Sequence, residues 1–133
     1  MKYMLDTDTC IYLIKNKPAC VRAQYQAHRE EELFISSITY AELCHGAQKS
    51  AAPEKNRLSL LLFLSYLEIL NFDPFAAEEY GVIRAGLERK GTLIGPKDML
   101  IAAHAKAEKC ILVTNNTREF SRVEGLMLEN WAN

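Results

Sequence analysis

Short apolar runs alternate with longer amphipathic segments along the 133 residues of this chain. The apolar runs are bounded by polar or turn residues and are too short for helices, which predicts buried strands. These runs lie at 2–5, 33–35, 68–70, 110–113 and 126–128. The segments between most of them repeat apolar residues at helical spacing. Strands that alternate with helices predict an α/β fold with a mainly parallel central sheet.

Prolines and glycines mark the expected ends of these helices. Pro18, Pro53 and the Gly95-Pro96 pair stand where proline suits the first helical turn. Gly91 follows a long apolar-periodic segment at 75–90 and suits the left-handed residue that closes a helix. The remaining helices are expected to start near 7 and near 36. Six helices are therefore predicted between the strands.

A parallel sheet of this kind brings several polar residues to one edge. Asp6, Ser36 and Asn116 each follow a predicted strand, so they lie at the carboxyl edge, where such folds bind ligands. The helix that carries Asp98 in its first turn leads back into a strand, so it starts at the same edge. Glu42 lies one to two turns into the helix after Ser36 and can lean over that edge. We therefore expect Asp6, Glu42, Asp98 and Asn116 to share one cleft.

Carboxylates gathered at close range repel one another, so at neutral pH they need raised pKa values or a bound cation. Oxygen ligands without cysteine or histidine favour Mg²⁺ or Mn²⁺ over Zn²⁺. Such a metal orients a water molecule and offsets the charge on a phosphate under in-line attack. The cleft is therefore predicted to be a metal-dependent phosphoryl-transfer site.

Ordinary structural roles also fit the first two acidic positions. Asp6, Thr7 and Asp8 together resemble a helix start, with Thr7 as the expected capping residue and Asp8 in the first turn. Glu42 stands three residues after Thr39, which is the spacing of a capping box. Neither residue indicates a site by itself.

The other polar signals have similar alternatives. Asp98 also suits the dipole of its helix, and Asn116 tolerates a left-handed turn. His28 and His45 are expected at the surface, and His104 is expected to have a structural or surface role because it lies nearly two turns beyond Asp98. Only the joint placement of the four candidates at one edge favours a site.

Composition narrows the class of protein. Hydrophobic residues make up 49% and charged residues 25% of the chain, which is typical of one globular domain, predicted to span 1–133. The four cysteines contain no CxxC pair, so neither a zinc site nor a redox dithiol is indicated. No secretory signal and no membrane-length apolar run is visible, which predicts a cytoplasmic protein with reduced thiols.

Four segments occur in an order and at a spacing that resemble a known family. MLDTDTC, SSITYAEL, GPKDMLIAAHA and LVTNNTREF resemble the VapC toxins, which are PIN-domain ribonucleases of type II toxin–antitoxin systems. The resemblance implies a three-layer α/β/α sandwich and a Mg²⁺-dependent endoribonuclease, with Mn²⁺ as a substitute. It also implies a structured RNA substrate, with the anticodon stem–loop of initiator tRNA as the best expectation, and hence inhibition of translation.

The family motifs carry their functional positions onto this chain. The first acid falls on Asp6, the second on Glu42 and the third on Asp98. The fourth position, often aspartate in PIN domains, is Asn116, which is neutral and better suited to hold water or substrate than metal. Glu119 is the nearby residue that could supply the missing charge.

The resemblance also implies partners. A VapB-type antitoxin blocks the cleft with its C-terminal segment, and the toxin forms a homodimer, often within a larger assembly. The apolar helix at 58–67 suits antitoxin or dimer contacts, although simple burial explains its composition equally well. Asp8 stands where the family usually has asparagine, and we expect it to have a secondary role at the metal site.

Two other interpretations compete. A haloacid-dehalogenase-like phosphatase would use Asp6 and Asp8 in a D-x-D-x-T motif, but Cys10 stands where threonine is required and the later Gly-Asp motif is missing. A PIN-like binding module without catalysis would have lost one of the acids, and Asp6, Glu42 and Asp98 are all present.

The net charge of −1 does not favour a nucleic-acid partner by itself. Setting aside the three acids of the predicted cleft leaves 16 basic against 14 acidic side chains. We therefore expect a small, local phosphate contact rather than a broad basic face. The candidate basic residues are Lys15, Lys17, Arg84, Arg89, Lys90, Lys97 and Arg118.

Overall fold

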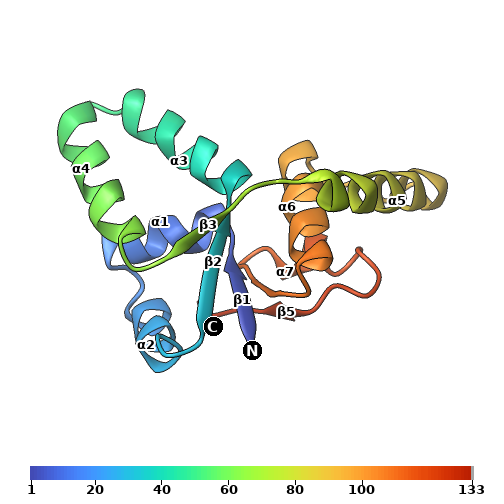
Figure 1. The fold of residues 1–133 in the computed structure, drawn as a ribbon, viewed down its shortest axis with the longest axis horizontal. Helices are drawn as coiled ribbons and strands as arrows, with labels where there is room; N and C mark the ends of the chain where they lie inside the picture. Colours follow the sequence, from blue (N-terminus) through green and yellow to red (C-terminus); the bar gives the residue numbers. More distant parts are fainter. Residues whose placement is uncertain (133) are drawn as a thin grey trace.

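The computed structural model describes residues 1–132 and contains a five-stranded sheet whose strands are all parallel (Figure 1). The strand order across the sheet is β3-β2-β1-β4-β5. The strands are β1 (Lys2–Leu5), β2 (Glu32–Ser36), β3 (Glu68–Leu70), β4 (Ile111–Val113) and β5 (Leu128–Glu129). The predicted α/β fold with a mainly parallel sheet is confirmed.

Seven helices in residues 1–132 cover the two faces of this sheet. In Figure 1, α1 to α4 lie on one side of the strands and α5 to α7 on the other. The helices are α1 (Thr7–Lys15), α2 (Ala19–Ala27), α3 (Ser37–Gln48), α4 (Pro53–Leu64), α5 (Pro74–Lys90), α6 (Pro96–Ala107) and α7 (Thr117–Phe120). The architecture is therefore the expected three-layer sandwich.

Alternation along the central strands builds a separate core on each face of the sheet. Successive strand side chains point to opposite faces. In β1, Tyr3 and Leu5 therefore pack with α1, α3 and α4, whereas Met4 packs with α5 and α6. All three are buried, so β1 is fixed from both sides. This burial holds the carboxyl edge of the sheet in place.

One predicted helix cap is wrong, and so is the alternative of a capping box at Glu42. Asp6, not Thr7, caps α1, because its Oδ1 accepts a hydrogen bond from the Thr9 amide at 2.9 Å while Thr7 is already helical. Ser36 caps α3 by accepting from the Ile38 amide at 3.1 Å, so α3 starts too early for a capping box between Thr39 and Glu42. The side chains freed from capping are available to the site described below.

The C-terminal part departs most from the prediction. Strand β5 is Leu128–Glu129 rather than 126–128, because Leu128 and Glu129 are the residues that pair with Leu112 and Val113. Helix α7, which follows Asn116, was not predicted. A helix of one turn is too short to give an apolar repeat that a sequence pattern can show.

Trp131 fastens the C-terminal segment to the core. Its side chain is 2% exposed, and its ring stacks on His28 at 4.9 Å and lies 6.0 Å from Tyr3. Its Nε1 donates a hydrogen bond to Glu129 Oε1 at 3.0 Å. His28 was predicted at the surface, but it is half-buried because the indole ring stacks on its imidazole.

Two general features complete the description. All four cysteines are free thiols. Within the described part of the chain, no helix has both the length and the apolar character needed to cross a membrane.

Replacing Trp131 with alanine is expected to lower the free energy of unfolding by about 3–5 kcal/mol, since it removes a buried aromatic side chain and leaves a cavity. Urea unfolding followed by circular dichroism measures the change. Phe75→Ala is the matched control, because Phe75 is 73% exposed and its removal leaves no cavity. An equal loss in the free energy of unfolding for the two variants would contradict the role of Trp131 in packing the C-terminal segment against the core.

Candidate active site

Asp6 stands directly after β1 at the carboxyl edge and is 5% exposed. Its amide donates to the Val113 carbonyl at 3.0 Å, which continues the pairing of β1 with β4. Burial raises the pKa of the Asp6 carboxyl, and hydrogen bonds from Thr114 and Thr9 hold it partly down. The carboxylate is thus fixed in place by the end of the sheet and the start of α1.

Glu42 reaches the same edge from α3. Its Oε1 accepts a hydrogen bond from the Thr7 hydroxyl at 2.7 Å, and its Oε2 lies 3.6 Å from the Lys97 ammonium. Thr7 belongs to α1 and Lys97 to α6, so one half-buried carboxylate connects three helices. The sequence indicated Thr7 only as a cap, and its position one residue after Asp6 is the single signal that could have suggested a role in the site.

Asp98 lies in the first turn of α6 and is half-buried. Its pKa is raised to about 6, first by burial and then by the charges of Glu119, Asp6, Glu42 and Asp8. Contacts show that Glu42 comes close to Asp98, because Glu42 pairs with Lys97, the neighbour of Asp98, and bonds to Thr7, the neighbour of Asp6. Within residues 1–132, no polar group donates a hydrogen bond to the Asp98 carboxylate, so its oxygens are free to bind a ligand.

Asn116 and Glu119 act as a pair. The Asn116 amide donates to Thr114 Oγ1 at 2.9 Å, and its side-chain Nδ2 donates to Glu119 Oε2 at 3.1 Å. Glu119 exerts the largest of the charge effects on the Asp98 carboxyl. Asn116 therefore positions Glu119, which brings the charge that Asn116 lacks. Asp8 is exposed at the rim of the cluster.

A buried histidine links two of the helices that carry these acids. His104 of α6 is fully buried, and its Nδ1 lies 2.7 Å from the Ser36 hydroxyl, which also caps α3. Burial lowers the pKa of the imidazole, which favours its neutral form. This agrees with the structural role expected for His104. The Ser36 contact, 68 residues away in the chain, had no sequence signal.

The donor set fits a hard divalent cation. Asp6, Glu42 and Asp98, with Glu119 beside them, offer only oxygen atoms, which suits Mg²⁺ or Mn²⁺. In the described residues, no three Asp, Glu, His or Cys side chains lie close enough to ligate one ion directly. This is compatible with Mg²⁺, which keeps several waters and takes one or two carboxylates.

A scan against protein-family models finds the PIN domain over residues 3–126. The chain belongs to the PIN-domain family. A protein of Salmonella typhimurium named tRNA(fMet)-specific endonuclease VapC is 49% identical over 131 residues, which cover 98% of each chain. A protein of the same name from Shigella flexneri is 48% identical over 99% of each chain. Within the PIN family the chain is therefore a member of the VapC group, as the sequence motifs indicated.

Solved structures give the same family. The structure of VapBC2 from Rickettsia felis bound to a DNA fragment from its promoter contains a chain that matches with a TM-score of 0.94 and 44% identity. This match covers 98% of the present chain and 99% of the Rickettsia felis chain. Membership of the PIN family over nearly the whole chain replaces the alternative of a haloacid-dehalogenase-like phosphatase built on Asp6 and Asp8.

Asp98→Asn is expected to stabilise the metal-free PIN-domain protein at pH 7.5. The folded pKa of about 6 lies above the ordinary aspartate pKa of 3.8, so this carboxyl favours folding below that lower value, and the benefit is lost as the pH rises through 6. With solvent screening of a half-buried group, the gain of the variant is about 1 kcal/mol. Thermal unfolding in EDTA at pH 7.5 and pH 3 measures it.

The difference should nearly vanish at pH 3, where the carboxyl is largely protonated in both the folded and the unfolded state. Glu30→Gln is the matched control, because Glu30 is exposed and lies in the turn before β2. A less stable Asp98→Asn at pH 7.5 would show that the repulsion at Asp98 is already relieved within the protein.

Proposed function

We propose that this PIN-domain protein is the toxin of a VapBC-type toxin–antitoxin system. Its activity is that of a metal-dependent endoribonuclease that cuts structured RNA and thereby inhibits translation. The observation that carries the proposal is the meeting of three acid-bearing helices at one sheet edge, where Glu42 of α3 bonds to Thr7, next to Asp6, and pairs with Lys97, next to Asp98. The names of the relatives from Salmonella typhimurium and Shigella flexneri support initiator tRNA as the substrate.

The acids of the site have different proposed roles. Mg²⁺ or Mn²⁺, when bound, orients a water molecule and offsets charge on the phosphate. Asp6 and Glu42 would hold the metal with carboxylates already fixed by Thr9 and Thr7. Asp98 would act on the waters that Mg²⁺ keeps, because no three of the described side chains lie close enough to ligate one ion directly. Such prior positioning lowers the reorganisation needed to reach the transition state.

The proposal also covers the location of the protein in the cell and its division into domains. Because tRNA is cytoplasmic, we propose a cytoplasmic protein. We also propose that residues 1–133 form a single PIN domain. Specificity comes from the shape of a stem–loop, since structured RNA presents few readable base edges in its helices. Lys97 stands beside Glu42 and can contact a phosphate close to the cut linkage. The anticodon stem–loop is the proposed place of cleavage.

The proposed activity is tested by sequencing RNA ends after brief expression without antitoxin. The wild-type protein should produce new ends at one position of initiator tRNA. Asp98→Asn should reduce cleavage of the purified transcript at least 100-fold, because it removes a ligand charge from the metal and from the transition state. Glu30→Gln, an exposed change outside the site, should cleave at the wild-type rate.

Wild-type rates for Asp98→Asn in EDTA would contradict the metal mechanism. RNA binding without cleavage by the wild-type protein would favour a binding module that has lost catalysis. A second measurement separates metal binding from activity: Mg²⁺ should raise the thermal unfolding temperature of the wild-type protein more than that of Asp98→Asn.

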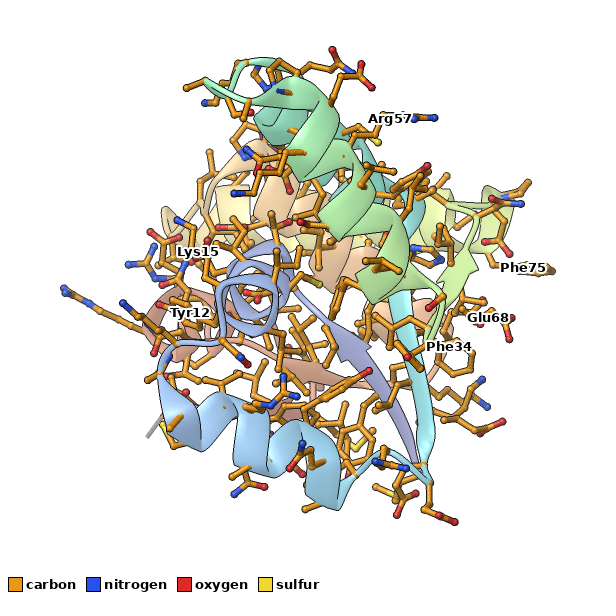
Figure 2. The ribbon with its side chains drawn as sticks, turned by 90° about the vertical axis from the view of Figure 1, so that its left-hand side faces the viewer. Tyr12, Lys15, Phe34, Arg57, Glu68 and Phe75 are labelled. Carbon is orange, nitrogen blue, oxygen red and sulfur yellow. The ribbon has the colours of Figure 1, made fainter. Side chains whose placement is uncertain are left out.

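A VapB-type antitoxin is the proposed partner, and α4 carries its proposed contact surface. Leu58, Leu61, Leu62 and Tyr66 are exposed, with Leu62 at 70% and Tyr66 at 79%. Figure 2 shows this side of the molecule, with α1 seen end-on between α4 above it and α2 below it. A hollow of about 640 Å³ lies among these three helices. Exposed apolar side chains beside a hollow are typical of protein-binding surfaces.

The similar structures from Rickettsia felis and Salmonella typhimurium are of VapBC complexes, which supports this partner. A homodimer, alone or within a larger toxin–antitoxin assembly, is part of the proposal.

Leu62→Asp is expected to weaken binding of the cognate antitoxin at least tenfold, because it places a charge in the centre of the apolar surface. Isothermal titration with the antitoxin measures the affinity, and cleavage of initiator tRNA should be unchanged. Met127→Asp is the matched control, since Met127 is also exposed but lies next to β5. Unchanged antitoxin affinity for Leu62→Asp would remove α4 from the proposed interface.

A further inference from the structure

A second hollow, of about 300 Å³, lies where α5, the end of α6 and the segment after α7 meet. Its walls carry one carboxylate, Glu124, and four basic side chains above an apolar floor. We call it the basic pocket, and its cations are Arg89, Lys90, Lys106 and Arg122. This is a concentration of positive charge in a chain whose net charge is −1.

Two of these cations are held in place without losing their charge. The Lys106 ammonium donates to the Glu124 carbonyl oxygen at 2.8 Å, and Arg122 Nη1 donates to the Leu93 carbonyl oxygen at 3.1 Å. Backbone carbonyls orient a cation but do not cancel it. Among the ion pairs within residues 1–132, none involves a cation of the basic pocket.

Helix ends explain only part of this arrangement. Arg89 and Lys90 lie in the last turn of α5 and Lys106 in the last turn of α6, where basic residues suit the helix dipole. Arg122 follows α7 and belongs to no helix. Helix dipoles also do not require the ends of two helices to direct their cations into one hollow. Like charges brought together repel, and an anion placed between them relieves that repulsion.

The basic pocket is connected to the candidate active site through α6 and the segment before it. Lys106 stands eight residues after Asp98 on the same helix, which is about 12 Å along the axis. Arg122 donates a hydrogen bond to the carbonyl of Leu93, three residues before the start of that helix at Pro96. An RNA strand that passes Asp98 is therefore within reach of the basic pocket with a neighbouring phosphate.

We propose that the basic pocket binds a backbone phosphate of the RNA substrate outside the cut linkage. The inference rests on the proposed function, and it names where the substrate is held. The acids of the active site repel an RNA backbone, so attraction must come from cations elsewhere on the protein. Arginine and lysine in a pocket are the groups that bind phosphate, and their contacts give RNA binding its salt dependence.

Gly86 of α5 gives a sharp test, because it lines the basic pocket and a Cβ added there meets nothing within 4 Å. Gly86→Glu adds a negative charge to the pocket, and Gly86→Gln adds the same volume without charge. Both residues favour a helix over glycine, so neither variant should unfold the protein. Binding of initiator tRNA is measured on the Asp98→Asn background, which keeps the RNA uncut.

Gly86→Glu is expected to weaken tRNA binding about tenfold and to lower the slope of log affinity against log salt by about 1. Gly86→Gln should stay within about twofold of the parent protein. Lys106→Gln should lower the salt slope in the same way. With Asp98 restored, Gly86→Glu should raise KM and leave kcat unchanged, since the pocket does not touch the reacting atoms.

The inference would be overturned if Gly86→Glu, Gly86→Gln and the parent protein had equal tRNA affinity and equal salt slopes. In that case, cleavage by the wild-type protein would still support the proposed function. A Gly86→Glu protein whose oligomeric state changes in sedimentation, with RNA binding lost only as a consequence, would also overturn it and make the pocket a protein contact. Failure of the wild-type protein to bind or cut tRNA would overturn the proposed function as well.

Discussion

Repulsion among the carboxylates at one edge of the sheet is the constraint on which the rest of this structure depends. Burial first, and then the charges of Glu119, Asp6, Glu42 and Asp8, raise the pKa of the Asp98 carboxyl to about 6. Such a cluster opposes folding until a cation or a proton relieves it. The protein holds it together because strand β1 and the capped start of α1 leave Asp6 little room to move away.

The surrounding fold supplies the rigidity that this cluster needs. Packing on both faces of β1 fixes the edge, and the buried contact between His104 and Ser36 ties α6 to the cap of α3. The clustered acids lower the free energy of unfolding, but they provide charges that could stabilise a transition state. Such a trade between stability and activity is common at active sites. The two other proposed binding surfaces lie away from the acids. Apolar side chains are exposed on α4, and basic side chains line the pocket beside α5.

Sequence patterns found most elements because their signals are local. Pro53 and Pro96 start helices, and Gly91 ends α5 in the left-handed conformation that glycine adopts without strain. The errors arose where a residue had two suitable local roles. Thr7 has the side chain of a cap, but its hydroxyl bonds to Glu42 instead, and only the approach of α3 to α1 makes that bond available.

The sequence by itself determined the order of the elements, the family and the acids that a parallel sheet brings to one edge. The tertiary structure decided which groups those acids contact and how deeply they are buried. It paired Asn116 with Glu119, placed Glu42 between Thr7 and Lys97, and left Asp98 without a donor among the described residues. These outcomes depend on burial and on distances between residues far apart in the chain. Periodicity and motif spacing carry no information about either quantity.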